Sequence, residues 1–164
     1  MTRINVFRNL KSTLTVVTRS NSIRAKEMQT LPLNLRPPTF RPDHWTKVLS
    51  LTGFSTDEHA DRALGKIKAY DLPIPRDHRA KGYDPVKGKI LAVAKALDEV
   101  KARGARLPPL TAQWERLDLK DVVKDQQMLW PAEVTHQVIP TKTPSYVKRI
   151  DEAWGEKAMT PASQ

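Results

Sequence analysis

Hydrophobic residues recur at helical spacing in the middle of the chain, and this pattern is most regular after Asp84. Asp84 is a suitable helix cap, Pro85 suits the first helical position, and Gly104 suits the end of the helix. The pattern therefore predicts a long helix from Asp84 to about Arg103 with one buried face. Its apolar stripe comprises Val86, Ile90, Val93, Ala94, Leu97 and Val100.

Two shorter helices are predicted upstream of the long one. Asp43 is placed to cap a helix that runs through Trp45 and Leu51 and ends at Gly53. Ser55 and Glu58 then form the Ser-x-x-Glu capping-box pattern before a second helix. The buried face of that second helix comprises Ala60, Ala63, Leu64 and Ile67.

The first 26 residues also fit an amphipathic helix. Val6, Phe7, Leu10, Leu14 and Val17 share one arc of a helical wheel, and no acidic residue precedes Glu27. A segment rich in Arg and Ser and poor in acids is typical of a mitochondrial transit peptide. The alternative is a basic arm that is retained and lies on nucleic acid.

Prolines interrupt the remaining parts of the chain. The segment 30–43 holds four prolines and should be an extended leash, and the segment 132–144 should be extended with room for one strand. A fourth helix is expected between Leu117 and Trp130, and a last one after Thr143.

The fold class expected from these elements is mainly α, with a small helical domain between extended proline-rich arms. Because such arms bury little surface, a partner is needed to order them. The expected parts are a basic arm or targeting segment (1–29), a proline-rich linker (30–42), the helical domain (43–104) and an extended C-terminal segment with short helices (105–164).

The formal net charge is +10, and it is concentrated in the front and middle of the chain. Residues 1–42 carry eight Lys or Arg and one acid, residues 43–110 thirteen against nine, and residues 111–164 seven against eight. This gradient favours a polyanionic partner for the front and middle and a different partner for the back.

The stretch RDHRAKGYDPVKGK, residues 76–89, does not match a nucleotide-binding loop. Five residues separate Gly82 from Gly88, Ile90 stands where a Ser or Thr is required, and Pro85 lacks a backbone N–H donor. The stretch is better interpreted as a basic surface that meets RNA phosphates without base specificity, or as a merely solvated one. The RNA-binding candidates are Arg3, Arg8, Lys11, Arg76, Arg79, Lys81, Lys87, Lys89, Arg103 and Arg106.

No motif points to catalysis, a cofactor or a metal. The chain has no cysteine, and its four histidines form no metal-binding pattern. No Ser or Thr stands in a nucleophile-elbow sequence. We therefore expect neither an enzyme nor a small-molecule substrate, and no apolar run is long enough to span a membrane.

Aromatic residues in the last third of the chain suggest contacts with other proteins. Three of the four tryptophans lie there, and Trp is a favoured anchor at protein interfaces. The alternative is that these tryptophans belong to the chain's own core. The protein-binding candidates are Trp114, Trp130, Tyr146, Ile150 and Trp154.

Residues 37–104 resemble the small-subunit mitochondrial ribosomal proteins with the IGR motif. The resemblance is carried by PPTFRPDHWTKVLSLTGF, EHAD, LPIP and GKILAVAKALDEVKARG, in that order. Leu51-Thr52-Gly53-Phe54 stands where that family has Ile-Gly-Arg. The resemblance implies a SAM-like helical domain, and the basic start and proline-broken arms are similar to mitochondrion-specific ribosomal proteins more broadly.

These features lead to two hypotheses of different kinds. The first is a structural component of the mitochondrial ribosome in the matrix, which binds rRNA through its basic arm and loop and neighbouring proteins through its C-terminal segment. The second is an accessory or assembly subunit of an inner-membrane respiratory complex. Under either hypothesis, the protein is not expected to act as a free monomer.

Overall fold

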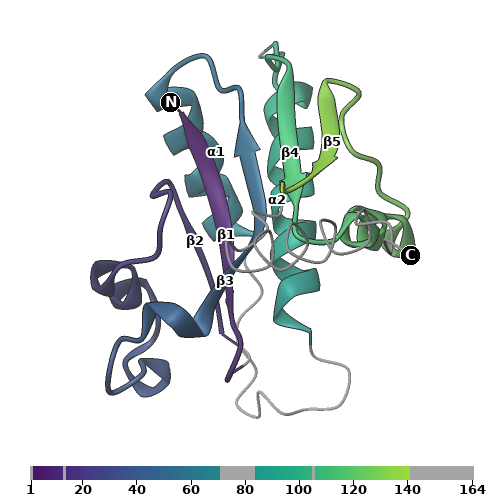
Figure 1. The fold of residues 1–164 in the computed structure, drawn as a ribbon. Coiled ribbons are helices and arrows are strands. Elements are labelled where there is room, and N and C mark those ends of the chain that lie inside the picture. The colour runs from purple at the N-terminus through teal and green to yellow at the C-terminus, as the bar shows by residue number, and fades with distance from the viewer. Residues whose placement is uncertain (1, 13, 71–83, 105, 141–164) are drawn as a thin grey trace, which may run out of the picture.

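The computed structural model describes residues 2–12, 14–70, 84–104 and 106–140, which form one mixed sheet with helices packed on it (Figure 1). The strand order is β2-β1-β3-β4-β5, with β4 and β5 parallel and the other neighbours antiparallel. The strands are β1 (Arg3–Asn9), β2 (Thr15–Thr18), β3 (Trp45–Thr52), β4 (Leu110–Trp114) and β5 (Val134–Val138). The expectation of a mainly α fold is wrong, because strands from residues 3–18 and from residues 110–138 meet on the two sides of β3.

The N-terminal segment is a β-hairpin rather than an amphipathic helix. β1 and β2 pair with Val6 opposite Val17, and the Asn9 side chain accepts hydrogen bonds from the backbone of Lys11 and Ser12 in the turn. Neighbouring residues of a strand face opposite sides, so Val6 and Phe7 enter two different apolar clusters. The apolar residues that lie together on a helical wheel are therefore divided between the two faces of the sheet.

Residues 45–52, predicted as a helix, form the central strand β3. Leu49 and Leu51 face α1 (Asp57–Ala69) and α2 (Pro85–Ala102), whereas Trp45 joins the cluster on the opposite face. Because both faces of β3 are covered, its sequence lacks the simple alternation of a half-exposed strand. The SAM-like helical domain implied by the resemblance is consequently not observed.

The predictions of the two other central helices are confirmed. In α1 the cap is Thr56, one residue after the predicted Ser55, and its side chain accepts a hydrogen bond from the backbone of His59. In α2 the Asp84 side chain caps the first turn. Gly104, with φ of 77°, follows its end in the left-handed conformation that favours glycine.

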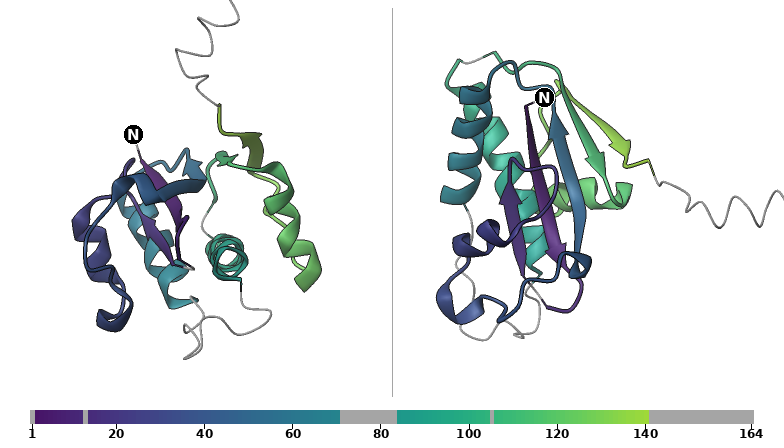
Figure 2. Two further views of the ribbon diagram at one scale, coloured as in Figure 1. Left: turned by 60° about the horizontal axis from the view of Figure 1, so that its bottom comes forward. Right: turned by 60° about the vertical axis from the view of Figure 1, so that its left-hand side comes forward.

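The two helices run side by side against one face of the sheet (Figure 2). Their apolar stripes meet those of β1, β3 and β4 in the larger cluster, in which Ile67, Val93 and Leu97 are almost completely buried. The two helical stripes predicted from the sequence thus form one core.

Residues 25–44, which include the segment 30–43 expected to be a proline-rich leash, contain three short 3-10 helices, η1 (Ala25–Thr30), η2 (Leu33–Leu35) and η3 (Pro42–His44). Met28 and Leu31 pack with Phe7 and Trp45 in a second cluster near β2. The segment therefore covers part of the chain's own sheet.

The C-terminal third begins with β4 and ends, among the described residues, with β5. Between them, the predicted fourth helix is a 3-10 helix, η4 (Leu117–Gln126), and the predicted strand is confirmed as β5. The last predicted helix lies outside the described residues. Residues 110–138 are thus not an extended arm, because β4 pairs directly with β3.

Candidate nucleic-acid interface

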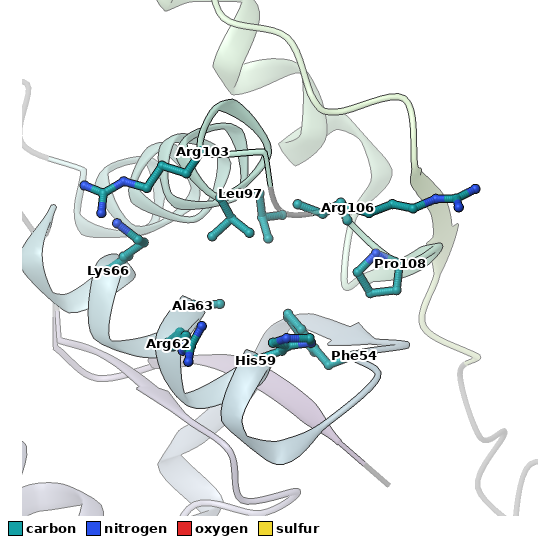
Figure 3. Close-up of a pocket in the computed structure, with 11 residues that line it drawn as sticks. Phe54, His59, Arg62, Ala63, Lys66, Leu97, Arg103, Arg106 and Pro108 are labelled. Atoms are coloured by element: carbon teal, nitrogen blue, oxygen red, sulfur yellow. The ribbon is translucent and has the colours of Figure 1, made fainter.

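A cavity of about 290 Å³ opens where the first half of α1 meets the end of α2 (Figure 3). Phe54 from the loop after β3 and Pro108 from the loop before β4 complete its wall. Gly53, which precedes Phe54, has φ of 105°, and a Cβ there would lie 2.5 Å from the carbonyl oxygen of Pro109. The close approach of these two loops therefore requires glycine, and it positions both Phe54 and Pro108 at the cavity.

The floor of the cavity is apolar. Ala63 from α1 and Leu97 from α2 are buried, and Leu107 lies beside them. Phe54 and Val100 are only partly buried and pack against the same core. The cavity thus reaches down from the surface to the larger hydrophobic cluster.

Four cationic side chains surround this apolar floor. Lys66 and Arg103 both pair with Glu99, at 2.5 and 2.6 Å, and Tyr70 donates a hydrogen bond to the same carboxylate. The hydrogen bond from Lys66, followed by the charges of Lys66 and Arg103, holds the pKa of Glu99 below its ordinary value. A single carboxylate therefore serves two of the four cations.

The other two cations, Arg62 and Arg106, are exposed and make no ion pair with any residue that the structure describes. Figure 3 shows Arg62 on the α1 side of the cavity and Arg106 extending outward past Pro108. Their positive charge is available to an anion from solvent.

His59 adds a ring to the wall next to Phe54 (Figure 3). Its Nδ1 lies 2.7 Å from the hydroxyl oxygen of Ser55, and its backbone N–H donates to the capping Thr56. The contact with Ser55, the residue before the cap, therefore orients this exposed ring at the edge of the cavity.

Of the predicted RNA-binding residues, the structure brings Arg103 and Arg106 together at this cavity. It places three others apart from it. Arg8 pairs with Glu115 at 2.9 Å, Arg3 donates to the Asn21 side chain, and Lys11 is exposed in the β1–β2 turn.

The basic stretch 76–89 is only partly described. Lys87 is exposed in the first turn of α2. Burial, with a smaller contribution from the charge of Lys68, lowers the pKa of Lys89 to about 8. Arg76, Arg79 and Lys81 lie outside the described residues.

Sequence reasoning missed Phe54, His59, Arg62 and Lys66. A signal for two of them was present, because Arg62 and Lys66 are four residues apart and flank Ala63 of the buried stripe. Nothing in the sequence indicated that this face of α1 would meet the end of α2.

The structure places Trp114, a predicted protein-binding residue, in the chain's own core with no exposed surface. Its indole N–H donates to His136 Nδ1 at 3.0 Å, and Trp130 packs edge-on against it at 5.5 Å. Trp114 is thus unavailable to a partner, and the core alternative holds for it. Tyr146, Ile150 and Trp154 lie outside the described residues.

Trp130 is half-buried, and its indole N–H donates to the carbonyl oxygen of Lys120. Together with Trp114 and His136 it forms an aromatic group that joins η4 to β5. Burial, followed by the charge of Lys120, lowers the pKa of His136, which suits its acceptance of the Trp114 hydrogen bond in the neutral form. Any contact of Trp130 with a partner would use only its outer edge.

Neither the models of known protein families nor the curated proteins contain a match to this chain. Within the described ranges, no helix has the length and apolar character required to cross a bilayer. The same residues contain no group of three His, Cys, Asp or Glu placed to hold a metal ion.

Proposed function

We propose that the protein is a structural, RNA-binding component of the mitochondrial ribosome. The observation that carries the proposal is the cationic rim of the α1–α2 cavity, in which Arg62 and Arg106 have no acidic partner among the described residues. Arg62 on α1 and Arg106 in the loop between α2 and β4 are suited to RNA phosphates, which attract unpaired arginines without regard to sequence.

The charge of the whole chain supports the same partner. An excess of ten positive charges produces a long-range attraction to polyanions and a strong dependence of binding on salt. The choice of the mitochondrial ribosome, and of neighbouring ribosomal proteins as further partners, rests on the basic start of the chain and on its resemblance to mitochondrion-specific ribosomal proteins.

The test combines a charge-removing variant with a matched control. The double variant Arg62→Gln and Arg106→Gln removes both unpaired cations from the cavity rim. The control, Arg41→Gln with Arg116→Gln, removes two exposed arginines that pair locally with Asp43 and Asp118. Both variants have the same net charge, so only the position of the removed charge differs.

RNA binding is measured at several salt concentrations with a mixed-sequence RNA. The rim variant should flatten the slope of log affinity against log salt by about 0.7–0.9 for each RNA phosphate that the protein no longer neutralises, and the control should flatten it less. Equal slopes in the two variants would show that RNA does not bind at the rim of the cavity.

Membership of the ribosome is tested separately with the tagged full chain. The protein should sediment with mitochondrial ribosomal particles, and the rim variant should dissociate from them at lower salt than the control. Co-purification with a detergent-solubilised respiratory complex in place of the particles would overturn the proposal in favour of an accessory subunit.

A further inference from the structure

We propose that the α1–α2 cavity receives one unpaired base of the bound RNA while the rim cations hold the neighbouring phosphates. This inference rests on the proposed function, and it adds a recognition element that phosphate binding alone does not need. It follows from the size of the cavity, the nature of its walls and the position of the charges around its mouth.

The size of the cavity is compatible with one ring-shaped group. A volume of about 290 Å³ lies at the lower end of the range of roughly 300–1,000 Å³ for sites that hold small molecules. One base fits within such a space.

The walls of the cavity suit a flat aromatic ring. Phe54 and His59 each contribute a ring to the lining, and the buried Ala63 and Leu97 contribute apolar surface (Figure 3). Unpaired RNA bases are recognised mainly by stacking on aromatic and histidine rings and on arginine planes. The cavity offers such surfaces without any buried carboxylate among its lining residues.

The charges at the mouth identify RNA rather than a purely apolar side chain as the occupant. Arg62 lies on the α1 side of the cavity, and Arg106 lies on the side of Pro108 (Figure 3). A base that enters the cavity carries a phosphate on each side of its sugar, so cations on both sides of the mouth are complementary to it. An apolar protein side chain would have no use for this arrangement.

A double helix cannot use the cavity, because its bases are stacked inside. The base must come from a single strand, a bulge or a loop, where stacking is already broken. The proposal therefore predicts a preference for single-stranded over double-stranded RNA at equal charge.

The test fills the cavity without changing any charge. Val100 lines the cavity on α2, and Val86 lies on the same helix, is also partly buried and does not line it. Val100→Phe should block the cavity, and Val86→Phe is the matched control. Thermal unfolding of both variants verifies that they are folded.

Binding is measured with an unstructured RNA octamer and with the same octamer carrying one central abasic residue. The wild-type protein and Val86→Phe should bind the intact octamer about 10-fold more tightly than the best-placed abasic octamer, as expected for the loss of one stacked base. Val100→Phe should bind both octamers equally and keep the wild-type salt slope. His59→Ala, which truncates an exposed side chain, should partly reduce the preference for the intact octamer over the abasic octamer.

Equal affinity of Val100→Phe and the wild-type protein for the intact octamer would overturn the inference. If Val100→Phe also no longer associated with ribosomal particles, the cavity would be assigned to a protein side chain instead of a base. Failure of the proposed function would look different. The wild-type protein would then not bind RNA, or the variant Arg62→Gln with Arg106→Gln would bind RNA with the same salt dependence as its control.

Discussion

The face of the sheet that carries α1 and α2 and the face near β2 that is covered by residues 25–44 bury side chains by different means. On the helix face, regular elements supply wide apolar stripes, and the resulting cluster extends from β1 to β5. On the other face, six buried side chains form a separate cluster under short 3-10 helices. The first surface is held mainly by apolar contact area, whereas the second needs specific hydrogen bonds.

Glu27 provides the principal hydrogen bonds of the second face. Its carboxylate, almost completely buried, accepts hydrogen bonds from Thr18, Ser20 and the backbone N–H of Arg24. Arg36 adds bonds to the carbonyl oxygens of Gln29 and Leu31. Irregular segments lack the repeated backbone bonds of helices, so side chains satisfy these groups instead.

The largest contrast is expected from truncating one apolar side chain on each face. Leu51→Ala on the helix face should destabilise the protein by about 4 kcal/mol, because the rigid helices cannot move in to fill the void that the removed side chain leaves. Met28→Ala on the other face should cost about 2 kcal/mol, because its short irregular cover can relax. Chemical denaturation of both variants measures the difference. An equal or larger loss for Met28→Ala would contradict the expectation that the cover of the second face relaxes more easily than the helices.

A smaller effect is expected from removing the hydrogen bonds of the second face. Glu27→Ala leaves buried donors without an acceptor and should cost about 1–3 kcal/mol. Hydrogen exchange should show that the loss of protection is concentrated in residues 20–44 and spares α2. Glu58→Ala, an exposed acid at the start of α1, is the control for the change in charge. Uniform loss of protection across the sheet would contradict the view that the hydrogen bonds of Glu27 hold residues 25–44 independently of the helix face.

The smallest effect concerns pH and belongs to the helix face. Because the pKa of Glu99 is lower in the folded protein than in the unfolded chain, its contribution to stability is complete above the ordinary carboxyl range and is lost as pH falls below about 4–5. Glu99→Gln should therefore lose less stability than wild type between pH 5.5 and 3. Asp98→Asn removes a neighbouring charge on the same helix and serves as the control. Parallel pH profiles for wild type and Glu99→Gln would show that the pairs with Lys66 and Arg103 do not stabilise the fold.

The fold could be predicted from the sequence only where local signals agreed with the final packing. Asp84, Pro85 and Gly104 bracket α2 because capping depends on neighbouring backbone groups alone. The same local reasoning was wrong for Val6 to Val17 and for Trp45 to Leu51. In these strands both faces are covered, and a run of apolar residues without alternation fits a helix as well as it fits a buried strand.

The candidate site likewise contains some residues that the sequence predicted and others that only the packing of the elements brings together. Arg103 and Arg106 were identified from their position after the long helix, but Phe54, Arg62 and Lys66 come from other elements and join them only when α1 packs beside α2. Trp114 is predicted to bind a protein because it is one of three tryptophans in the last third of the chain and Trp is a favoured interface anchor. Its burial arises from β4 lying beside β3, a pairing between residues 49 and 114 that no local pattern indicates.

The sequence by itself determined the positive charge, the absence of thiol chemistry, the two amphipathic helices α1 and α2 and the glycine at the end of α2, because each of these depends on residue type or on contacts within a few positions. Only the tertiary structure decided that residues 3–18 and residues 110–138 share one sheet and that four cations surround one apolar cavity. Strand pairing and helix packing join residues tens of positions apart, and their free energy comes from surface buried jointly by both partners, which neither segment carries alone.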